Sequence, residues 1–245
     1  GIYVFQARAY KADGEQATTT VTYLIKSGAL PSVKIADLVG KQNPTAKVAL
    51  LGDAALPEDA PTGAELTLSW SLVTDSPIVL GDIATTKLNA INLVLQPNAL
   101  APGATYTFML KAEFDGRSTT ATANVLMNRA PFGGGFVLEH DTPVVALTTE
   151  VALKAVNWAD DPEDKPLKYS FAYRASTADA SLQSSYTSLG KKGLASRATW
   201  LPFEGNWIIV CRISDVYDAT TRVDQNLTVA AVVLDASKAA NLLTA

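Results

Sequence analysis

The chain has 245 residues, 48% of them hydrophobic, and its 20 basic and 24 acidic residues give a formal net charge of −4. This length suggests one or two domains that bury their own cores, and the weakly acidic balance argues against a nucleic-acid partner. No apolar run approaches the roughly 20 residues of a membrane-spanning helix, so we expect no membrane insertion in this segment. The single cysteine, Cys211, excludes a disulfide within it.

Three stretches repeat one alternating pattern about every hundred residues, a spacing that suits tandem β-sandwich domains. They begin at Tyr3, Tyr106 and Trp207, whose shared register predicts side chains on the inward face, and each continues through a polar turn into a second alternating run. The sequence therefore predicts an all-β chain of separate sandwiches.

The first predicted unit, residues 1–28, is a hairpin with its turn at residues 12–14 and a return strand through Tyr23 and Ile25. An isolated hairpin is marginal in water. We therefore expect it to be the C-terminal hairpin of a preceding β-sandwich, with its other strands upstream or in a neighbouring chain, and the segment to be a piece of a longer polypeptide.

The second predicted unit covers residues 29–128. Residues 66–72 alternate cleanly and predict a central strand that buries Trp70, and residues 88–95 predict another strand. The turn that carries Leu100, the pair at 102–103 and Tyr106 resembles a turn of fibronectin type III domains. That resemblance implies that the Tyr106 hydroxyl caps backbone groups at the corner.

The third predicted unit covers residues 129–234. Strands at 151–158 and 167–173 flank an acidic turn, residues 176–196 are predicted to be a long polar surface excursion, and a hairpin follows. Residues 235–245 contain helix formers but are too few for an independent helix, so we interpret them as a linker.

The most specific stretch begins Asn128-Arg-Ala-Pro and continues through three glycines, Ala-Leu-Thr-Thr at 146–149, the run from Trp158 to Asp164, and Pro-Leu-Lys-Tyr at 166–169. This succession resembles the receptor-for-egg-jelly (REJ) module of polycystin-type proteins. Together, the resemblances predict tandem immunoglobulin-like, fibronectin type III-like β-sandwiches, with residues 129–234 as the REJ-like domain.

The sequence departs from that family at two positions. Members often carry cysteines where this chain has Phe136 and Ala155. Two apolar residues there predict a contact between strands that is kept by packing instead of a bond.

The family resemblance also implies a function and a location. Members are large, non-catalytic ectodomains or surface components of cilia and gametes, so we expect an extracellular, non-enzymatic structural or adhesive segment. Its expected partners are neighbouring domains of the same chain and other surface or filament proteins, including a polycystin-type channel. A carbohydrate- or calcium-binding recognition module is the alternative.

One acidic cluster is a candidate metal site: Asp160, Asp161, Glu163 and Asp164. Calcium binds about six to eight oxygen ligands, and carboxylates at an inter-strand turn supply them. The competing interpretation is a solvated turn in which aspartate side chains cap backbone amides. On sequence alone the solvated turn is the favoured interpretation, because the spacing matches no EF-hand loop and Lys165 dilutes the negative charge.

The residues that suggest catalysis have simpler explanations. His140 is the only histidine, no serine lies in an elbow motif, and a solvated turn explains it. Cys211 shares the register of Ala7 and Leu110, which predicts a buried, unreactive thiol. The glycines at 133–135 lack the lysine and helix of a phosphate loop, so we expect no catalytic site and no cofactor.

Two further features concern glycans. Asn226, in the sequence Asn-Leu-Thr, is an acceptor for N-glycosylation if the chain is secreted. Trp158, Trp200 and Trp207 suggest a sugar-stacking platform, but core packing is the stronger interpretation for Trp207, and Trp200 is expected to be the freest of the three.

Overall fold

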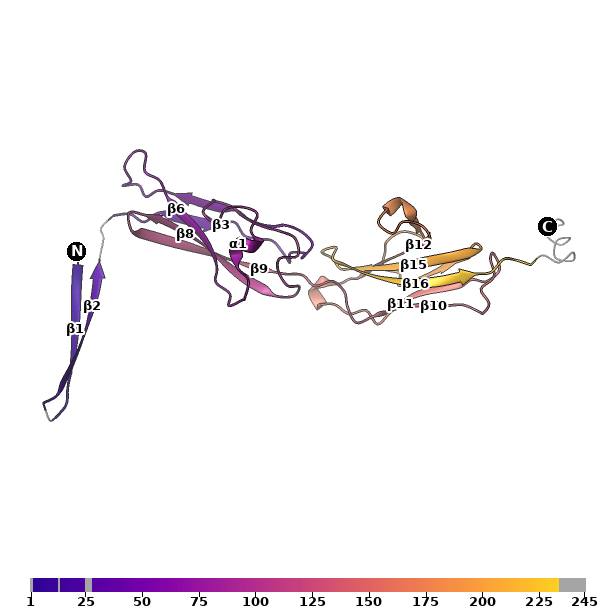
Figure 1. Ribbon diagram of the computed structural model, residues 1–245, viewed down its shortest axis with the longest axis horizontal. Helices are drawn as coiled ribbons and strands as arrows, with labels where there is room; N and C mark the ends of the chain where they lie inside the picture. The colour runs from indigo at the N-terminus through magenta and orange to yellow at the C-terminus, as the bar shows by residue number, and fades with distance from the viewer. Residues whose placement is uncertain (1, 13, 25–27, 234–245) are drawn as a thin grey trace. The chain divides into compact units, whose positions relative to one another are not determined.

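The computed structural model describes residues 2–12, 14–24 and 28–233 (Figure 1). Its strands are β1 (Ile2–Tyr10), β2 (Gln16–Leu24), β3 (Ser32–Ile35), β4 (Val48–Leu50), β5 (Gly52–Ala55), β6 (Thr67–Leu72), β7 (Leu93–Leu95), β8 (Thr105–Phe114), β9 (Arg117–Leu126), β10 (Gly135–Glu139), β11 (Val151–Val156), β12 (Lys168–Ala175), β13 (Thr187–Ser188), β14 (Arg197–Trp200), β15 (Gly205–Ser214) and β16 (Thr220–Val229). Short helical turns lie at α1 (Leu80–Ile83), η1 (Pro162–Asp164) and η2 (Gln183–Ser185). Among the described residues, no helix is long and apolar enough to cross a membrane.

The chain forms two compact units. The first comprises residues 1–40, 46–99 and 105–126, and the second comprises residues 41–45, 100–104 and 127–245. The two short segments 41–45 and 100–104 were expected in the earlier domain, yet they join the second unit because their backbones bond to its first residues: Asn128 N donates to Gln42 O at 2.8 Å and Met127 N to Ala104 O at 2.9 Å. The predicted linker at 235–245 lies outside the described residues.

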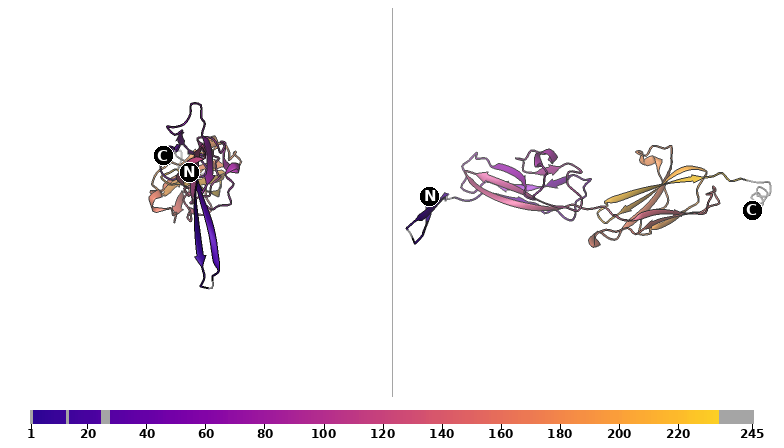
Figure 2. Two further views of the ribbon diagram at one scale, coloured as in Figure 1. Left: turned by 90° about the vertical axis from the view of Figure 1, so that its left-hand side faces the viewer. Right: turned by 60° about the horizontal axis from the view of Figure 1, so that its bottom comes forward.

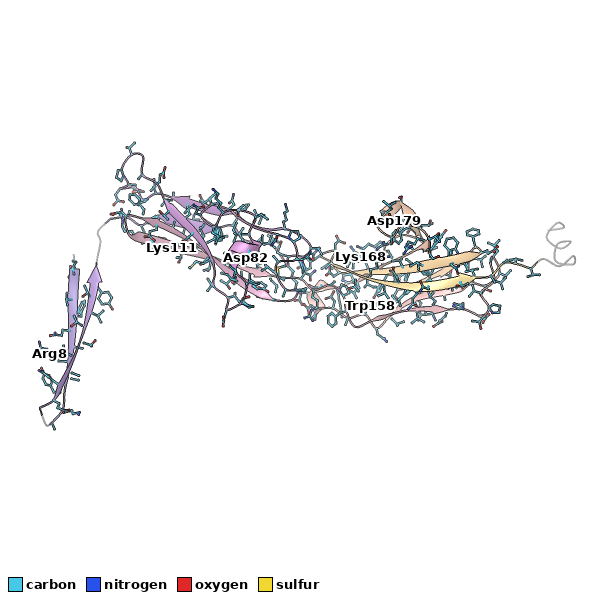
Figure 3. All side chains as sticks on the ribbon, viewed as in Figure 1. Arg8, Asp82, Lys111, Trp158, Lys168 and Asp179 are labelled. Atoms are coloured by element: carbon cyan, nitrogen blue, oxygen red, sulfur yellow. The ribbon has the colours of Figure 1, made fainter. Side chains whose placement is uncertain are left out.

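The predicted N-terminal hairpin is confirmed. Strands β1 and β2 pair antiparallel from Ile2 opposite Leu24 to Tyr10 opposite Gln16. Every residue of β1 is exposed, and Figure 3 shows side chains on both faces of the hairpin. Tyr3, expected to point into a core, is 51% exposed. That the hairpin belongs to a preceding sandwich stays a prediction.

The first unit contains the three-stranded sheet β6-β8-β9 and the pairs β4-β7 and β3-β5. Trp70 and Tyr106 are buried as predicted, and Phe108 of β8 is fully buried. The strand expected at 88–95 is shorter, since only Leu93–Leu95 is extended. Residues 88–92 turn instead and present carbonyls to Trp70, whose indole donates to Ala90 O at 3.0 Å.

The second unit is a sandwich of two sheets, β10-β11-β14 and β13-β12-β15-β16. Figures 1 and 2 show β12, β15 and β16 in one layer and β10 and β11 in the other. Alternate residues of both sheets meet in one apolar core, which includes Phe136, Val151, Leu153, Ala155, Phe171, Trp200, Ile209, Cys211, Ile213, Leu227 and Val229. The predicted fold class, all-β with tandem immunoglobulin-like sandwiches, is confirmed.

The predicted packing contact between Phe136 and Ala155 is also confirmed. The two residues lie directly opposite each other on β10 and β11, and both are buried. An aromatic ring beside a methyl group thus fills the space at the two positions where the REJ resemblance places cysteines.

The excursion at residues 176–196 leaves the end of β12 and returns to it. Asp179 marks its outer part in Figure 3. Strand β13 pairs with Ala172 and Tyr173 of β12, so the excursion adds an edge strand to the larger sheet.

Candidate functional site

The acidic turn between β11 and β12 contains two kinds of carboxylate. Asp160 and Asp164 are 8% and 0% exposed, whereas Asp161 and Glu163 are exposed. The turn is therefore not solvated at the first pair, although Asp160 Oδ1 accepts a hydrogen bond from Asp161 N at 2.9 Å, as the capping interpretation expected. The helical turn η1 is the reason, because its hydrogen bond from Asp164 N to Asp161 O (3.0 Å) turns the Asp164 side chain inward.

The buried partner of this turn is Lys41, from the short segment 41–45. Its Nζ lies 2.7 Å from Asp164 Oδ2, 2.8 Å from Asp161 Oδ2 and 3.2 Å from Glu163 Oε1. Desolvation by itself would lower the pKa of Lys41, but the hydrogen bonds to the three carboxylates outweigh it and raise that pKa. The same hydrogen bond from Lys41 lowers the pKa of Asp161.

Asp215, in the turn after β15, completes the cluster from the other side. Its Oδ1 accepts from the backbone N–H groups of Tyr217 (2.8 Å) and Ala219 (2.9 Å). Its Oδ2 accepts from Asn128 Nδ2 at 2.7 Å, and the same Nδ2 donates to Asn43 Oδ1 at 2.9 Å. Asp215 and Asn128 are both fully buried, so four segments of the second unit meet in one hydrogen-bonded network.

The carboxylates that converge are Asp160, Asp164 and Asp215, whose ligand oxygens all lie within 4.8 Å of one another. Burial raises the pKa of Asp160, and the neighbouring charges of Asp164 and Asp215 add to that effect. Sequence analysis named Asp160 and Asp164 but missed Lys41, Asn128 and Asp215. The sequence did contain a signal for Asn128, because this residue is the first of the motif that resembles the REJ module.

The two residues considered for catalysis, Cys211 and His140, lie in different surroundings. Cys211 is fully buried among the core side chains as predicted, and burial raises the pKa of its thiol to about 12. His140 is half-buried, with its Nδ1 3.0 Å from the backbone oxygen of Asp141. The thiol is thus poorly suited to nucleophilic attack.

Gly134, the residue before β10, has a packing role. A side chain at Gly134 would overlap the indole of Trp158, and that indole donates to Gly135 O at 3.0 Å. Trp158 thereby packs against the core (Figure 3).

The expectation that Trp200 is the freest tryptophan is wrong. It is 7% exposed, because its ring stacks on Tyr173 at 4.5 Å and meets Trp207 edge-on at 5.9 Å. Trp207 packs against the same core, as predicted.

The glycosylation candidate Asn226 lies on β16, an edge strand of the larger sheet. Asn226 and Thr228 are both exposed, and Thr228 Oγ1 donates to Asn206 Oδ1 at 2.9 Å. Glycosylation itself stays a prediction.

Several solved structures are similar to this chain. Domains A168–A170 of titin share 14% identity over 94% of this chain and 75% of that one, with a TM-score of 0.42. The fibronectin(III)-like modules of Clostridium thermocellum CbhA share 15% identity over 82% and 95%, with a TM-score of 0.35. The N-terminal eight Ig domains of Down Syndrome Cell Adhesion Molecule share 14% identity over 94% and 28%, with a TM-score of 0.37.

The family comparison covers the whole sequence. The REJ domain matches residues 1–245, which include the motif from Asn128 onward and the core pair Phe136 and Ala155. The chain belongs to the REJ domain family.

Proposed function

We propose that this chain is a non-enzymatic structural and adhesive segment of a large extracellular protein, and that it acts through domain–domain and protein–protein contacts. The observation that carries the proposal is a second unit with a continuous apolar core, in which the single thiol of the chain is buried as packing material. Membership of the REJ domain family supports an extracellular location.

The parent protein that we propose is polycystin-like and lies on the surface of a cell, of a cilium or of a flagellum. Its partners are neighbouring domains of the same long chain and other surface or filament proteins, such as a polycystin-type channel. We further propose that β1 and β2 are the C-terminal hairpin of a preceding sandwich, because a covering sheet would bury Phe5 and Tyr23, which now stand 61% and 57% exposed.

The contact surface that we favour is the excursion at residues 176–196 with the neighbouring face of β12, β15 and β16. Leu182 and Leu194 are 53% and 67% exposed on it. Tyr186 lies near three guanidinium groups, at 5.9, 5.1 and 5.1 Å from its ring, which belong to Arg174, Arg212 and Arg222. Exposed leucines beside arginines and a half-buried tyrosine form a combination that is typical of protein interfaces.

Labelling of intact cells tests the location. An antibody raised against residues 176–196 is expected to label cells that make the protein without permeabilisation, with signal on cilia or flagella. Labelling that appears only after permeabilisation contradicts the extracellular proposal. Loss of a glycan from the secreted chain in N226Q would support it independently.

Site-specific photo-crosslinking tests the contact surface. A photoreactive residue at Leu182 is expected to capture other surface proteins, whereas one at Val137 of β10, which is also exposed, serves as the matched control. Equal capture at both positions would show that the excursion is not the preferred surface.

The alternative of a carbohydrate-binding module depended on an accessible Trp200, and Trp200 is buried. The four tryptophans of the chain are buried or half-buried, and Trp200 stacks inside the fold. We therefore do not propose a sugar platform on these residues.

A further inference from the structure

Three buried carboxylates converge in the second unit, and the Lys41 ammonium contacts one of them, through Asp164 Oδ2. The ligand oxygens of Asp160, Asp164 and Asp215 lie within 4.8 Å of one another. Two oxygens that bind the same calcium ion, each at about 2.3–2.6 Å, are separated by at most about 5 Å. The spacing of the three side chains is therefore compatible with one ion.

Two oxygens of the three carboxylates have no hydrogen-bond partner. Asp160 Oδ2 and Asp164 Oδ1 are buried and unpaired, in residues that are 8% and 0% exposed. An unpaired carboxylate oxygen inside a protein is costly, and native structures rarely keep one. Both unpaired oxygens belong to carboxylates of the convergent set, so two of the three candidate ligands have a buried oxygen that lacks a donor.

Lys41 does not form a hydrogen bond with either of these two oxygens. Its ammonium group has three N–H donors, and it contacts three carboxylates: the other oxygen of Asp164, Asp161 and Glu163. The carboxylate of Asp164 thus has one oxygen on the lysine and one buried oxygen without a hydrogen-bond partner. Asp161 and Glu163 neutralise Lys41 and stand outside that set.

Asp215 is oriented by neutral donors. Two backbone N–H groups hold its Oδ1, and the Asn128 amide holds its Oδ2. The two lone pairs of Oδ1 accept the two backbone bonds, whereas Oδ2 accepts one bond and keeps a second lone pair with which Asp215 can bind an ion. Such outer hydrogen bonds are how proteins fix the direction of metal ligands.

We propose that Asp160, Asp164 and Asp215 bind one Ca²⁺ ion, with water at the remaining coordination positions. An all-carboxylate donor set suits a hard cation, and Mg²⁺ usually takes only one or two carboxylates from a protein. This inference does not depend on the adhesive role proposed above.

Calorimetric titration of the whole 245-residue chain, first treated with EDTA, tests the proposal. We expect one Ca²⁺ bound per chain with a Kd of about 10⁻⁴–10⁻³ M, the range of extracellular modules. D160N is expected to weaken binding by about tenfold or more, because affinity follows the number of ligand charges. The matched control is D161N, one residue away in the same turn, which is expected to keep the affinity within about twofold because Asp161 binds Lys41.

Thermal unfolding separates loss of binding from loss of folding. Asp160 Oδ2 has no partner to lose, so D160N is expected to unfold in EDTA at the same temperature as the unsubstituted chain or higher. Calcium is expected to raise the unfolding temperature of the unsubstituted chain and of D161N by clearly more than that of D160N.

Three results would overturn the inference. The first is an absence of heat and of any shift in unfolding temperature at about 10 mM Ca²⁺, well above the expected Kd. The second is equal weakening by D160N and D161N, which would place the ion elsewhere on the turn. The third is binding of Mg²⁺ as tight as that of Ca²⁺. The titration of the unsubstituted chain decides the question even if D160N fails to fold.

Discussion

The hairpins β1-β2 and β8-β9 carry the same alternating pattern but differ in what covers them. Phe5 and Phe108 occupy the same register of the repeat, yet Phe5 is 61% exposed and Phe108 is fully buried. In the second unit, β15 repeats the pattern, and its Ile209 lies in a core shared with the opposite sheet. Alternation therefore determines which residues share a face of a strand, whereas burial requires a second sheet against that face.

The largest expected effect on stability comes from replacing the two matched phenylalanines, Phe5 and Phe108, by alanine. F108A is expected to destabilise the first unit by about 3–5 kcal/mol, because it removes a fully buried ring and leaves a cavity. F5A is expected to change stability by less than about 0.5 kcal/mol, as surface substitutions usually do. Urea unfolding followed by circular dichroism measures both. Similar costs for the two variants would show that Phe5 is packed in solution.

The repeat made much of this fold predictable. Turn residues and alternating runs located the hairpins, and the register of the repeat predicted the burial of Tyr106 and Cys211. The prediction that Tyr3 is buried was wrong for a physical reason. The strand that contains Tyr3 has the same alternating pattern as the buried strands, but the pattern does not show whether a second sheet covers the strand. The turn at residues 88–92 was missed because its apolar residues also fit a strand.

The next effect concerns the reactivity of a thiol at two equivalent positions of the repeat. Ala7, which is exposed, occupies the position in β1 that the buried Cys211 occupies in β15. Burial raises the pKa of Cys211 to about 12 from an ordinary value of 9.0. At pH 8 its thiolate is thus about a thousandfold scarcer than that of an exposed cysteine. We expect A7C to react with iodoacetamide at least about a thousandfold faster than Cys211, as measured by mass spectrometry of the native chain. Comparable rates would mean that β15 opens readily.

A smaller effect follows from the same shift as the pH rises. The folded pKa of Cys211 lies above its unfolded value, so the stabilisation is complete below about pH 9 and is lost between about pH 9 and 12. The raised pKa of Lys41 acts in the same direction at higher pH. We expect the second unit to lose about 1 kcal/mol between pH 9 and 10 through the thiol. C211A lacks that ionisation and is expected to show a shallower decline in alkaline urea titrations, and an unchanged slope would contradict the assignment.

The polar site was only partly predictable, and its chemistry explains why. Asp160 and Asp164 stand together in an acidic run, which signals carboxylates in one place. Lys41 and Asp215 lie far from that run in sequence, and each resembles an ordinary surface charge in its own neighbourhood. Only the meeting of four segments makes Lys41 a buried counter-ion and Asp215 a third convergent carboxylate.

The smallest expected effect is that of removing the exposed hairpin altogether. Residues 2–10 of β1 are exposed throughout, so deletion of residues 1–24 removes little buried apolar surface. We expect the free energy of unfolding of each of the two units to change by less than about 0.5 kcal/mol. The single substitution F108A, by contrast, is expected to lower the free energy of unfolding of the first unit by about 3–5 kcal/mol. Differential scanning calorimetry of the shortened and complete chains makes the comparison. A loss above about 1 kcal/mol would show that the hairpin contributes to the stability of the first unit, because only burial of its apolar face could supply that much. A shift within the expected limit would leave the face of Phe5 and Tyr23 available for another sheet, as we propose.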